Sequence, residues 1–289
     1  MNLQNASLPR RSLLAMLPGL LTACSAVDVL NATVATDTYQ RTQGLAYGPH
    51  PRQLVDVYRP NTRVDNPHMV VFFYGGSWSS GDRADYRFVG EALASQGIVT
   101  VVADYRLSPE VRYPVFVQDS ASAMRWAFEH AGDYGVDTSR ILVMGHSAGA
   151  YNAAMLALDA RWLQAVGLAP SRLAGWIGLA GPYDFLPIGD RLTQVAFNWP
   201  QTPPDSQPLS HASRASPPAL LLAPLHDTVV DPVRSTVALA KRLQASGVRV
   251  AYEQFAGVSH VTLVAAMASV LRGRAPVLER VTNFVNSAA

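Results

Sequence analysis

Short runs of apolar residues alternate with longer amphipathic stretches along most of the chain. The runs, rich in β-branched and aromatic residues, predict strands, and the amphipathic stretches predict helices. The expected strands are Gln53–Tyr58, Met69–Tyr74, Ile98–Ala103, Ile141–Gly145, Gly175–Leu179, Ala219–Ala223 and Val248–Phe255. The expected helices are Ala84–Gln96, Pro114–Ala131, Ala148–Asp159, Val233–Ser246, Ser259–Leu271 and Pro276–Ser287. This alternation predicts an α/β fold with a mostly parallel sheet and helices on both faces.

One segment breaks this rhythm. Phe185–Pro218 is rich in proline, contains Phe197 and Trp199, and shows no clean period. A long insertion in a compact domain is commonly a functional loop. We therefore expect residues 185–218 to form a small cap over the carboxyl ends of the strands.

The N-terminus has the pattern of an export signal. Arg10 and Arg11 precede an apolar run that is too short to span a bilayer comfortably, and the run ends in Leu-Thr-Ala-Cys at Cys24. This ending resembles a bacterial lipobox, in which the cysteine becomes the lipid-bearing N-terminus after cleavage. An ordinary signal peptide followed by a chance cysteine is the alternative.

The lipobox interpretation divides the chain into three parts. Residues 1–23 would be the lipoprotein signal peptide, residues 24–40 a lipid-anchored spacer, and residues 41–289 the folded domain. The mature protein would then be held on a membrane of the bacterial cell envelope by its lipid, facing the periplasm or the exterior. Cys24 is the only cysteine, so no disulfide within one chain is possible.

The charge of the chain argues against a nucleic-acid partner. The formal net charge is +2, from 23 basic and 21 acidic residues. Two of the basic residues, Arg10 and Arg11, belong to the expected leader, which leaves 21 of each sign in the mature chain. A neutral chain without a basic stripe lacks the electrostatic footprint of a nucleic-acid binder.

A candidate nucleophile lies between an expected strand and an expected helix. Gly145–Gly149 reads Gly-His-Ser-Ala-Gly, with Ser147 at its centre. A sharp strand-to-helix turn leaves no room for side chains two residues before and after the serine, which explains the glycines. The turn also places the hydroxyl at a helix N-terminus, where developing negative charge is favoured. We expect His146 to point away from Ser147.

A serine hydroxyl needs an imidazole as base, itself oriented by a carboxylate. Around this type of turn the three residues follow one another in the order serine, acid, histidine. His260 follows the last expected strand and is the expected base. His226 lies beside the expected acid, and His211 lies within the Pro-rich segment.

Asp227 is the expected acid because it lies in the loop after the strand Ala219–Ala223. Asp231 is the first alternative, but it precedes Pro232 and a helix, where an aspartate commonly acts as N-cap. Asp184, which follows the previous strand, is the second alternative.

The oxyanion of an acyl-transfer reaction needs backbone donors. The amides of Gly76 and Ser77, after the strand Met69–Tyr74, and the amide of Ala148 are the expected donors, since paired glycines let the backbone approach a substrate. Three aromatic residues are candidates for a substrate pocket, with ordinary packing as the alternative: Trp78, Phe197 and Trp199.

Six motifs occur in the order typical of one family. They are Tyr47-Gly48, Leu54–Tyr58, Tyr74–Trp78 (Tyr-Gly-Gly-Ser-Trp), Asp104–Pro109 (Asp-Tyr-Arg-Leu-Ser-Pro), Gly145–Gly149 and Gly181–Asp184 (Gly-Pro-Tyr-Asp). From about Tyr47 to its end, the chain resembles the α/β-hydrolase esterases of the hormone-sensitive-lipase-like group. It is most similar to the small-cap branch with feruloyl-esterase-like proteins and kynurenine formamidases.

The chain departs from the family pattern at two places. The family has a histidine before the paired glycines, which braces the oxyanion loop through hydrogen bonds, and this chain has Tyr74 there. The acid loop of the family, His-Gly-x-x-Asp, is one residue shorter here, reading Pro-Leu-His-Asp at 224–227. Asp227 still stands four residues before Asp231 and its following proline.

Together these features predict a serine carboxylesterase that hydrolyses small-molecule esters through an acyl-enzyme, without cofactor or metal. Ser147 would attack the ester, His260 would move the proton, and Asp227 would orient His260. The first alternative is an amidase of the formamidase kind, which the same site could support. The second is a catalytically silent envelope protein that uses the fold for binding or assembly.

Overall fold

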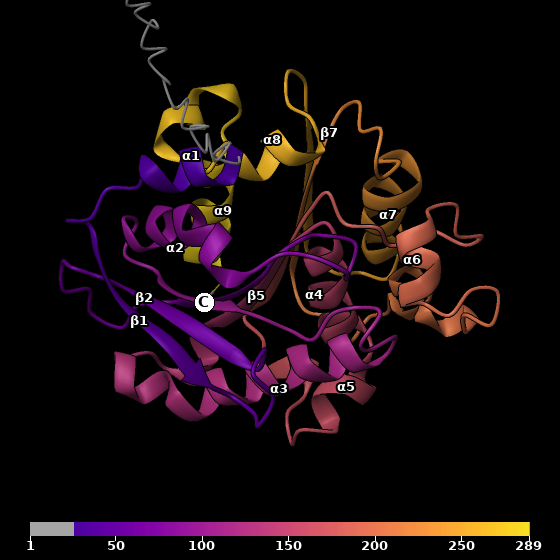
Figure 1. The fold of residues 1–289 in the computed structure, drawn as a ribbon, viewed down its shortest axis with the longest axis horizontal. Coiled ribbons are helices and arrows are strands. Elements are labelled where there is room, and N and C mark those ends of the chain that lie inside the picture. The colour runs from indigo at the N-terminus through magenta and orange to yellow at the C-terminus, as the bar shows by residue number, and fades with distance from the viewer. Residues whose placement is uncertain (1–25, 289) are drawn as a thin grey trace, which may run out of the picture.

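The computed structural model describes residues 26–288, and an eight-stranded sheet runs through its centre (Figure 1). The strand order is β1-β2-β4-β3-β5-β6-β7-β8; β1 and β2 pair in antiparallel fashion with their neighbours, and the other pairs are parallel. The strands are β1 Tyr39–Ala46, β2 Leu54–Pro60, β3 Met69–Phe73, β4 Val99–Ala103, β5 Ile141–His146, β6 Gly175–Leu179, β7 Ala219–Pro224 and β8 Val250–Phe255. The predicted α/β class is confirmed.

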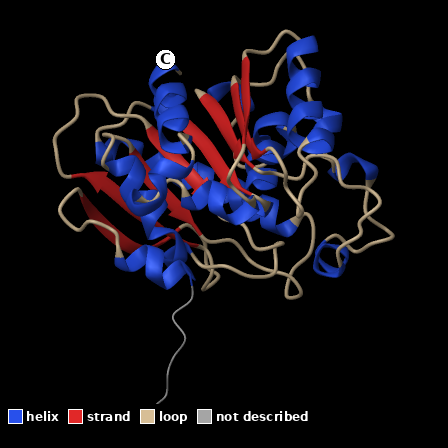
Figure 2. Cartoon of the chain, turned by 90° about the horizontal axis from the view of Figure 1, so that it is seen from above, coloured by secondary structure: helices blue, strands red, loops and turns tan. Residues whose placement is uncertain are grey.

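Helices cover both faces of this sheet (Figures 1 and 2). Helices α2 and α9 contact each other on one face, and α3 and α4 contact each other on the other. The α-helices are α1 Ala26–Ala32, α2 Arg87–Ala94, α3 Val115–His130, α4 Ala148–Leu158, α5 Ala160–Gln164, α6 Arg191–Ala196, α7 Ala238–Ala245, α8 His260–Ala265 and α9 Val277–Ser287. The 3₁₀ and π turns are η1 Arg83–Tyr86, η2 Ala131–Tyr134, η3 Thr138–Arg140, η4 Pro170–Arg172, η5 Pro204–Ser206, η6 Pro208–His211, η7 Val233–Val237 and η8 Ser269–Arg274.

The central strands are mostly apolar, with Thr100 and His146 as buried polar exceptions, because helices cover both of their faces. Every residue of β3, β4 and β5 is buried. Strands of this kind read as continuous hydrophobic runs, which is the pattern expected of a doubly covered parallel sheet. The register sets Phe73 opposite Gly145, so β3 and β5 end side by side. The loops that follow these two strands therefore meet at one edge.

The N-terminal boundary differs from the expected one. Residues 24–40 were expected to be a spacer, but α1 and the first residues of β1 lie within them. Leu30 and Val34 pack against the core, so this segment belongs to the folded unit. Strand β1 carries little apolar signal because it is an exposed edge strand. Its Gly44, at φ 69°, lies where the register with β2 shifts.

The helix expected over Ser259–Leu271 is shorter in the structure. A capping box starts α8: the Ser259 side chain accepts from the Thr262 amide, and the Thr262 side chain interacts with the Ser259 amide. The helix tightens at its end, where the amides of Met267 and Ala268 bond to carbonyls three residues back. Ala268 is then extended, and η8 follows as a separate turn. Apolar residues continue through this break, so the hydrophobic pattern does not reveal it.

The insertion between β6 and β7 contains α6, η5 and η6. Its Phe185 and Phe197 pack against Trp78, which lies in the loop after β3. No helix within residues 26–288 is long and apolar enough to cross a membrane. The proposed leader and Cys24 lie outside the described residues.

Candidate active site

The turn between β5 and α4 holds Ser147 in a backbone conformation that side chains rarely adopt, with φ 53° and ψ −121°. The two glycines of the motif are required by close packing. A Cβ at Gly145 would lie 2.1 Å from the carbonyl oxygen of Gly149, and one at Gly149 would lie 2.0 Å from that of Phe73. The turn therefore brings the β3 and β5 loops together and presents the Ser147 hydroxyl at the carboxyl edge of the sheet.

Three side chains form a hydrogen-bonded series at this edge. His260 Nε2 lies 2.8 Å from Ser147 Oγ, and His260 Nδ1 lies 2.7 Å from Asp227 Oδ2. An ionised carboxylate can only accept, so Nδ1 carries the proton and donates to Asp227. Nε2 is then free to accept the proton of the Ser147 hydroxyl. The structure thus brings together the three residues expected from the sequence.

The loop after β7 holds the Asp227 carboxylate in place. Its second oxygen, Oδ1, accepts from the amides of Val229 at 2.8 Å and Val230 at 3.1 Å. Partial burial raises the pKa of Asp227, but the hydrogen bonds from His260 and these amides outweigh it and leave the pKa below its usual value. The carboxylate therefore remains ionised next to the imidazole.

The two alternative acids, Asp231 and Asp184, interact with groups other than His260. Asp231 accepts from the amides of Val233 and Arg234, as expected of an N-cap. Asp184 forms an ion pair with the Arg234 guanidinium at 3.1 Å. Of the other two histidines that follow Ser147 in the sequence, His226 is exposed and His211 contacts the carbonyl of Asp205.

The β3 loop lies against Ser147, and its Gly76 and Ser77 line the same cavity as Ser147. A Cβ at Gly75 would lie 2.9 Å from that of Ser147, and Gly76, at φ 127°, has a conformation suited to glycine alone. Within residues 26–288, the amides of Gly76 and Ser77 donate to no other group. The Ala148 amide belongs to the first turn of α4, where amides have no partner within the helix. All three are free to bind an oxyanion.

Tyr74 links this loop to a buried polar network. Its hydroxyl donates to Asp104 Oδ1 at 2.6 Å and accepts from Arg52 at 2.7 Å. Arg52 also donates to the carbonyl of Gly81 at 2.8 Å, and Arg83 donates to Asp104 through its amide and its guanidinium. Burial raises the pKa of Asp104 above its usual value, although the hydrogen bonds from Tyr74 and Arg83 oppose this shift. The tyrosine therefore connects both ends of the loop to one carboxylate.

His146 was expected to point away from the serine, and its contact was not foreseen. The side chain is buried, and its Nε2 lies 3.0 Å from the backbone carbonyl of His260. Burial, and next the neighbouring His260, lower the pKa of His146 to about 3, so the ring is neutral and donates to this carbonyl. His146 thus holds the backbone of His260 in position. Sequence reasoning could not find the contact because it joins residues 114 positions apart.

The cavity beside these groups has a volume of about 600 Å³. Its lining residues are Val27, Leu30, Gly75, Gly76, Ser77, Ser80, Gly81, Asp85, Tyr86, Phe88, His146, Ser147, Val229, His260, Val261, Val264 and Ala265. No residue of the insertion 185–218 is among them, so this segment does not border the cavity as a cap would. Within the described residues, no group of three His, Cys, Asp or Glu side chains is placed to hold a metal ion.

The three aromatic candidates for a substrate pocket do not line this cavity. Trp78 and Phe197 are 2% and 1% exposed, and their rings meet edge to face at 4.7 Å. Trp78 also donates to Asn152 of α4 at 3.0 Å. Trp199 is half-buried and packs against the same core. All three therefore have the ordinary packing role that is the alternative to a substrate pocket.

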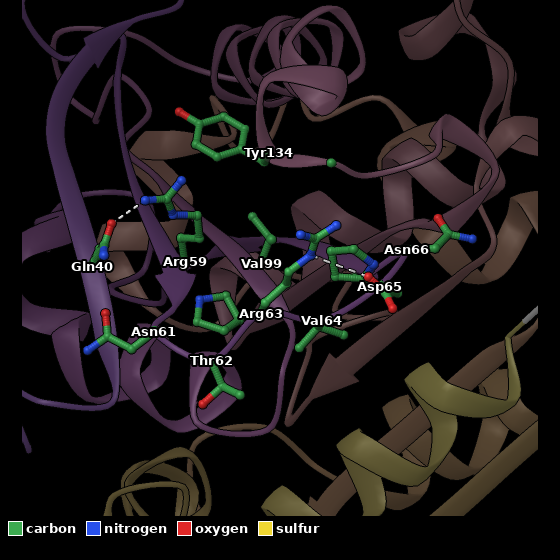
Figure 3. A pocket seen from close by; sticks show the side chains of 13 residues that line it. Gln40, Arg59, Asn61, Thr62, Arg63, Val64, Asp65, Asn66, Val99 and Tyr134 are labelled. Carbon is green, nitrogen blue, oxygen red and sulfur yellow. Dashed lines mark hydrogen bonds and ion pairs between the residues drawn. The ribbon is translucent and has the colours of Figure 1, made fainter.

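A second cavity, of about 400 Å³, lies at the amino ends of the parallel strands, near the start of β4 (Figure 3). Arg59 donates to Gln40 there, and Arg63 pairs with Asp65 at 3.5 Å. The lining residues include no serine, cysteine or histidine. This cavity is therefore no candidate for nucleophilic chemistry.

The sheet, the turn at Ser147 and the hydrogen-bonded Ser-His-Asp series define an α/β-hydrolase. The chain matches the BD-FAE family over residues 55–243 and belongs to it. The expected resemblance to the hormone-sensitive-lipase-like esterases is thereby confirmed.

Known relatives are esterases. The chain is 30% identical to Esterase LipC of Mycobacterium tuberculosis over 242 residues, which cover 77% of this chain and 60% of LipC. It is 45% identical to Carboxylesterase NlhH of the same species over 109 residues, 37% of this chain and 34% of NlhH. This chain thus spans less than two thirds of the length of either relative. A truncated carbohydrate esterase from gut microbiota shares the fold, with a TM-score of 0.76 at 17% identity, over 88% of this chain and 98% of that one.

Proposed function

We propose that this protein is a serine carboxylesterase acting on small-molecule esters. The observation that carries the proposal is the hydrogen-bonded series Ser147–His260–Asp227, which opens onto a largely apolar cavity. Membership of the BD-FAE family and similarity to LipC and NlhH support it.

In the proposed mechanism, Ser147 attacks the ester carbonyl while His260 Nε2 takes the hydroxyl proton. The amides of Gly76, Ser77 and Ala148 stabilise the oxyanion of the tetrahedral intermediate. His260 then gives the proton to the leaving alcohol, and an acyl-enzyme remains on Ser147. Water, deprotonated by His260, releases the acid by the same steps. Asp227 keeps the imidazole in the required tautomer throughout.

The test is a series of p-nitrophenyl esters of increasing acyl length, measured alongside an N-formyl amide. We expect turnover of at least one ester and a much lower kcat/KM for the amide. Preference for the amide would instead establish a formamidase. No turnover of either substrate, together with no labelling by a fluorophosphonate, would indicate a silent scaffold.

We further propose that Cys24 carries lipid and anchors the mature protein in the bacterial cell envelope. The support is the sequence pattern of residues 1–24. Two chains of lipid would be enough for stable anchoring without a transmembrane helix.

A further inference from the structure

The cavity beside Ser147 has a wall that lies outside the loops of the sheet. Val27 and Leu30 of α1 line it, although α1 precedes the first strand. They share the cavity with Val261 and Val264 of α8, the helix that begins with His260. Figure 1 shows α1 above α2 and next to α8. An N-terminal segment therefore lines the same cavity as the helix that begins with His260.

Hydrogen bonds fix α1 in this position. Asn31 Nδ2 donates to the carbonyls of Ala84 at 3.0 Å and Asp85 at 3.1 Å, and Asn31 Oδ1 accepts from the Phe88 amide at 3.3 Å. The guanidinium of Arg87 donates to the Asn31 carbonyl. The Asn31 side chain thus joins the end of α1 to η1 and to the start of α2. Helix α1 is therefore held in place by hydrogen bonds as well as by apolar contacts.

The position of this wall identifies the part of the ester that it contacts. His260 Nε2 must reach the oxygen of the leaving alcohol to return the proton. The alcohol group therefore leaves the reacting carbon on the side of His260 and α8, whose Val261 and Val264 share the cavity with Val27 and Leu30 of α1. On that side the lining is apolar, with Leu30, Val261 and Val264.

We propose that α1 is a specificity element that binds the alcohol portion of the substrate, and that the preferred substrates are esters of apolar alcohols several carbons long. This inference rests on the proposed esterase activity and names the substrate class of that same site. Burial of each methylene between α1 and α8 should raise kcat/KM by about fourfold, until the cavity is filled.

The test uses two series of esters. One consists of methyl, butyl and hexyl acetates, which vary the alcohol, and the other of methyl acetate, butyrate and hexanoate, which vary the acid. For the wild-type protein, kcat/KM should rise along the first series. Leu30→Ala should lower kcat/KM for hexyl acetate by about tenfold and leave methyl acetate within about twofold. Its profile along the acid series should stay that of the wild type.

Val29→Ala is the matched control, since Val29 lies on the same helix but is 56% exposed and does not line the cavity. It should behave as the wild type in both series. Leu30→Phe, which fills the cavity and keeps the wall, should also reject hexyl acetate while it hydrolyses methyl acetate. This second variant keeps the test valid if Leu30→Ala detaches α1.

The outcomes separate the two proposals. If the wild type hydrolyses no ester and takes no fluorophosphonate, the proposed function fails. If the wild type is active but both Leu30 variants keep its dependence on alcohol length, the inference about α1 is overturned. A change confined to the acid series would overturn it as well, because α1 would then bind the acyl group.

Discussion

Replacing Tyr74 with phenylalanine removes one buried hydroxyl and leaves the ring in place. That hydroxyl joins two charged groups, Asp104 and Arg52. After the change, Asp104 keeps the amide of Arg83 at 2.8 Å, and Arg52 keeps the carbonyls of Tyr105 and Gly81. The variant therefore breaks the link in the network without emptying the site.

Removal of the hydroxyl should have two separate effects, one on the free energy of unfolding and one on turnover. A hydrogen bond to a charged group contributes about 1.5–3 kcal/mol, and each partner of Tyr74 retains other bonds, so the free energy of unfolding should fall by about 2–3 kcal/mol. Turnover should fall by about tenfold or less, because the amides of Gly76 and Ser77 remain in place. The KM should change little, as for interactions made mainly in the transition state.

Tyr74→Ala should lower turnover further. The Tyr74 ring packs so closely on Gly81 that a Cβ there would lie 2.7 Å from it. An emptied site would let the loop drift, and small displacements of oxyanion donors are costly.

The assay is urea unfolding and steady-state hydrolysis of p-nitrophenyl acetate on the same preparations. Tyr58→Phe is a matched control, because Tyr58 is also fully buried but its hydroxyl has no partner among the described residues. It should change neither kcat nor stability appreciably. Two results would refute the reasoning. If Tyr74→Phe lost activity as completely as Ser147→Ala, the hydroxyl would be a direct donor to the oxyanion. If Tyr74→Phe left the free energy of unfolding unchanged, the hydrogen bonds of Tyr74 to Asp104 and Arg52 would not stabilise the fold.

The remaining predictions concern the acid, a buried histidine and the N-terminus. Asp227→Asn should lower kcat for ester hydrolysis on the order of 10⁴-fold, whereas Asp231→Asn, which preserves an N-cap, should stay within about twofold; the reverse ranking would move the acid to Asp231. His146 is neutral in the folded protein, with a pKa of about 3 against 6.5 when unfolded. Below pH 6.5 His146 takes up a proton in the unfolded chain but stays neutral in the folded one, which favours unfolding. The contribution of neutral His146 to the free energy of unfolding is therefore fully present above pH 6.5 and is lost as the pH falls. From pH 6 to pH 5 the wild type should lose about 1 kcal/mol more of its unfolding free energy than His146→Gln in urea titrations, and equal losses would show that His146 titrates normally. Cys24→Ser should move the protein from the membrane fraction to the soluble fraction or block its processing, with kcat unchanged; a mature wild-type chain that begins after Cys24 would contradict the lipid anchor.

The sequence was sufficient for the central fold because its strands are buried on both faces. Runs such as Met69–Phe73 and Gly175–Leu179 carry a continuous apolar signal, and the turn at Ser147 imposes its glycines through steric contacts. Strand β1 and helix α1 escaped prediction for the opposite reason. The strand is exposed and polar, and α1 is a single short helix held by the side chain of Asn31.

At the site, residues within one motif were predictable and contacts between distant segments were not. Ser147 and His260 follow from local patterns after strands. The bond from His146 to the His260 carbonyl, and the wall made by Leu30, depend on how loops and helices meet in the folded protein. Trp78 and Phe197 were candidates for a substrate pocket but lie in the core. The sequence alone does not show whether an aromatic side chain near a site faces a ligand or the core.

The most direct test of the central claim is the site of covalent labelling by a fluorophosphonate. The folded wild-type protein is treated with the probe, digested, and the modified peptide is sequenced by mass spectrometry. We expect one adduct per chain, on Ser147, with labelling abolished in Ser147→Ala and strongly slowed in Asp227→Asn. An adduct on another residue, or undiminished labelling of Ser147→Ala, would contradict the assignment of Ser147 as the nucleophile.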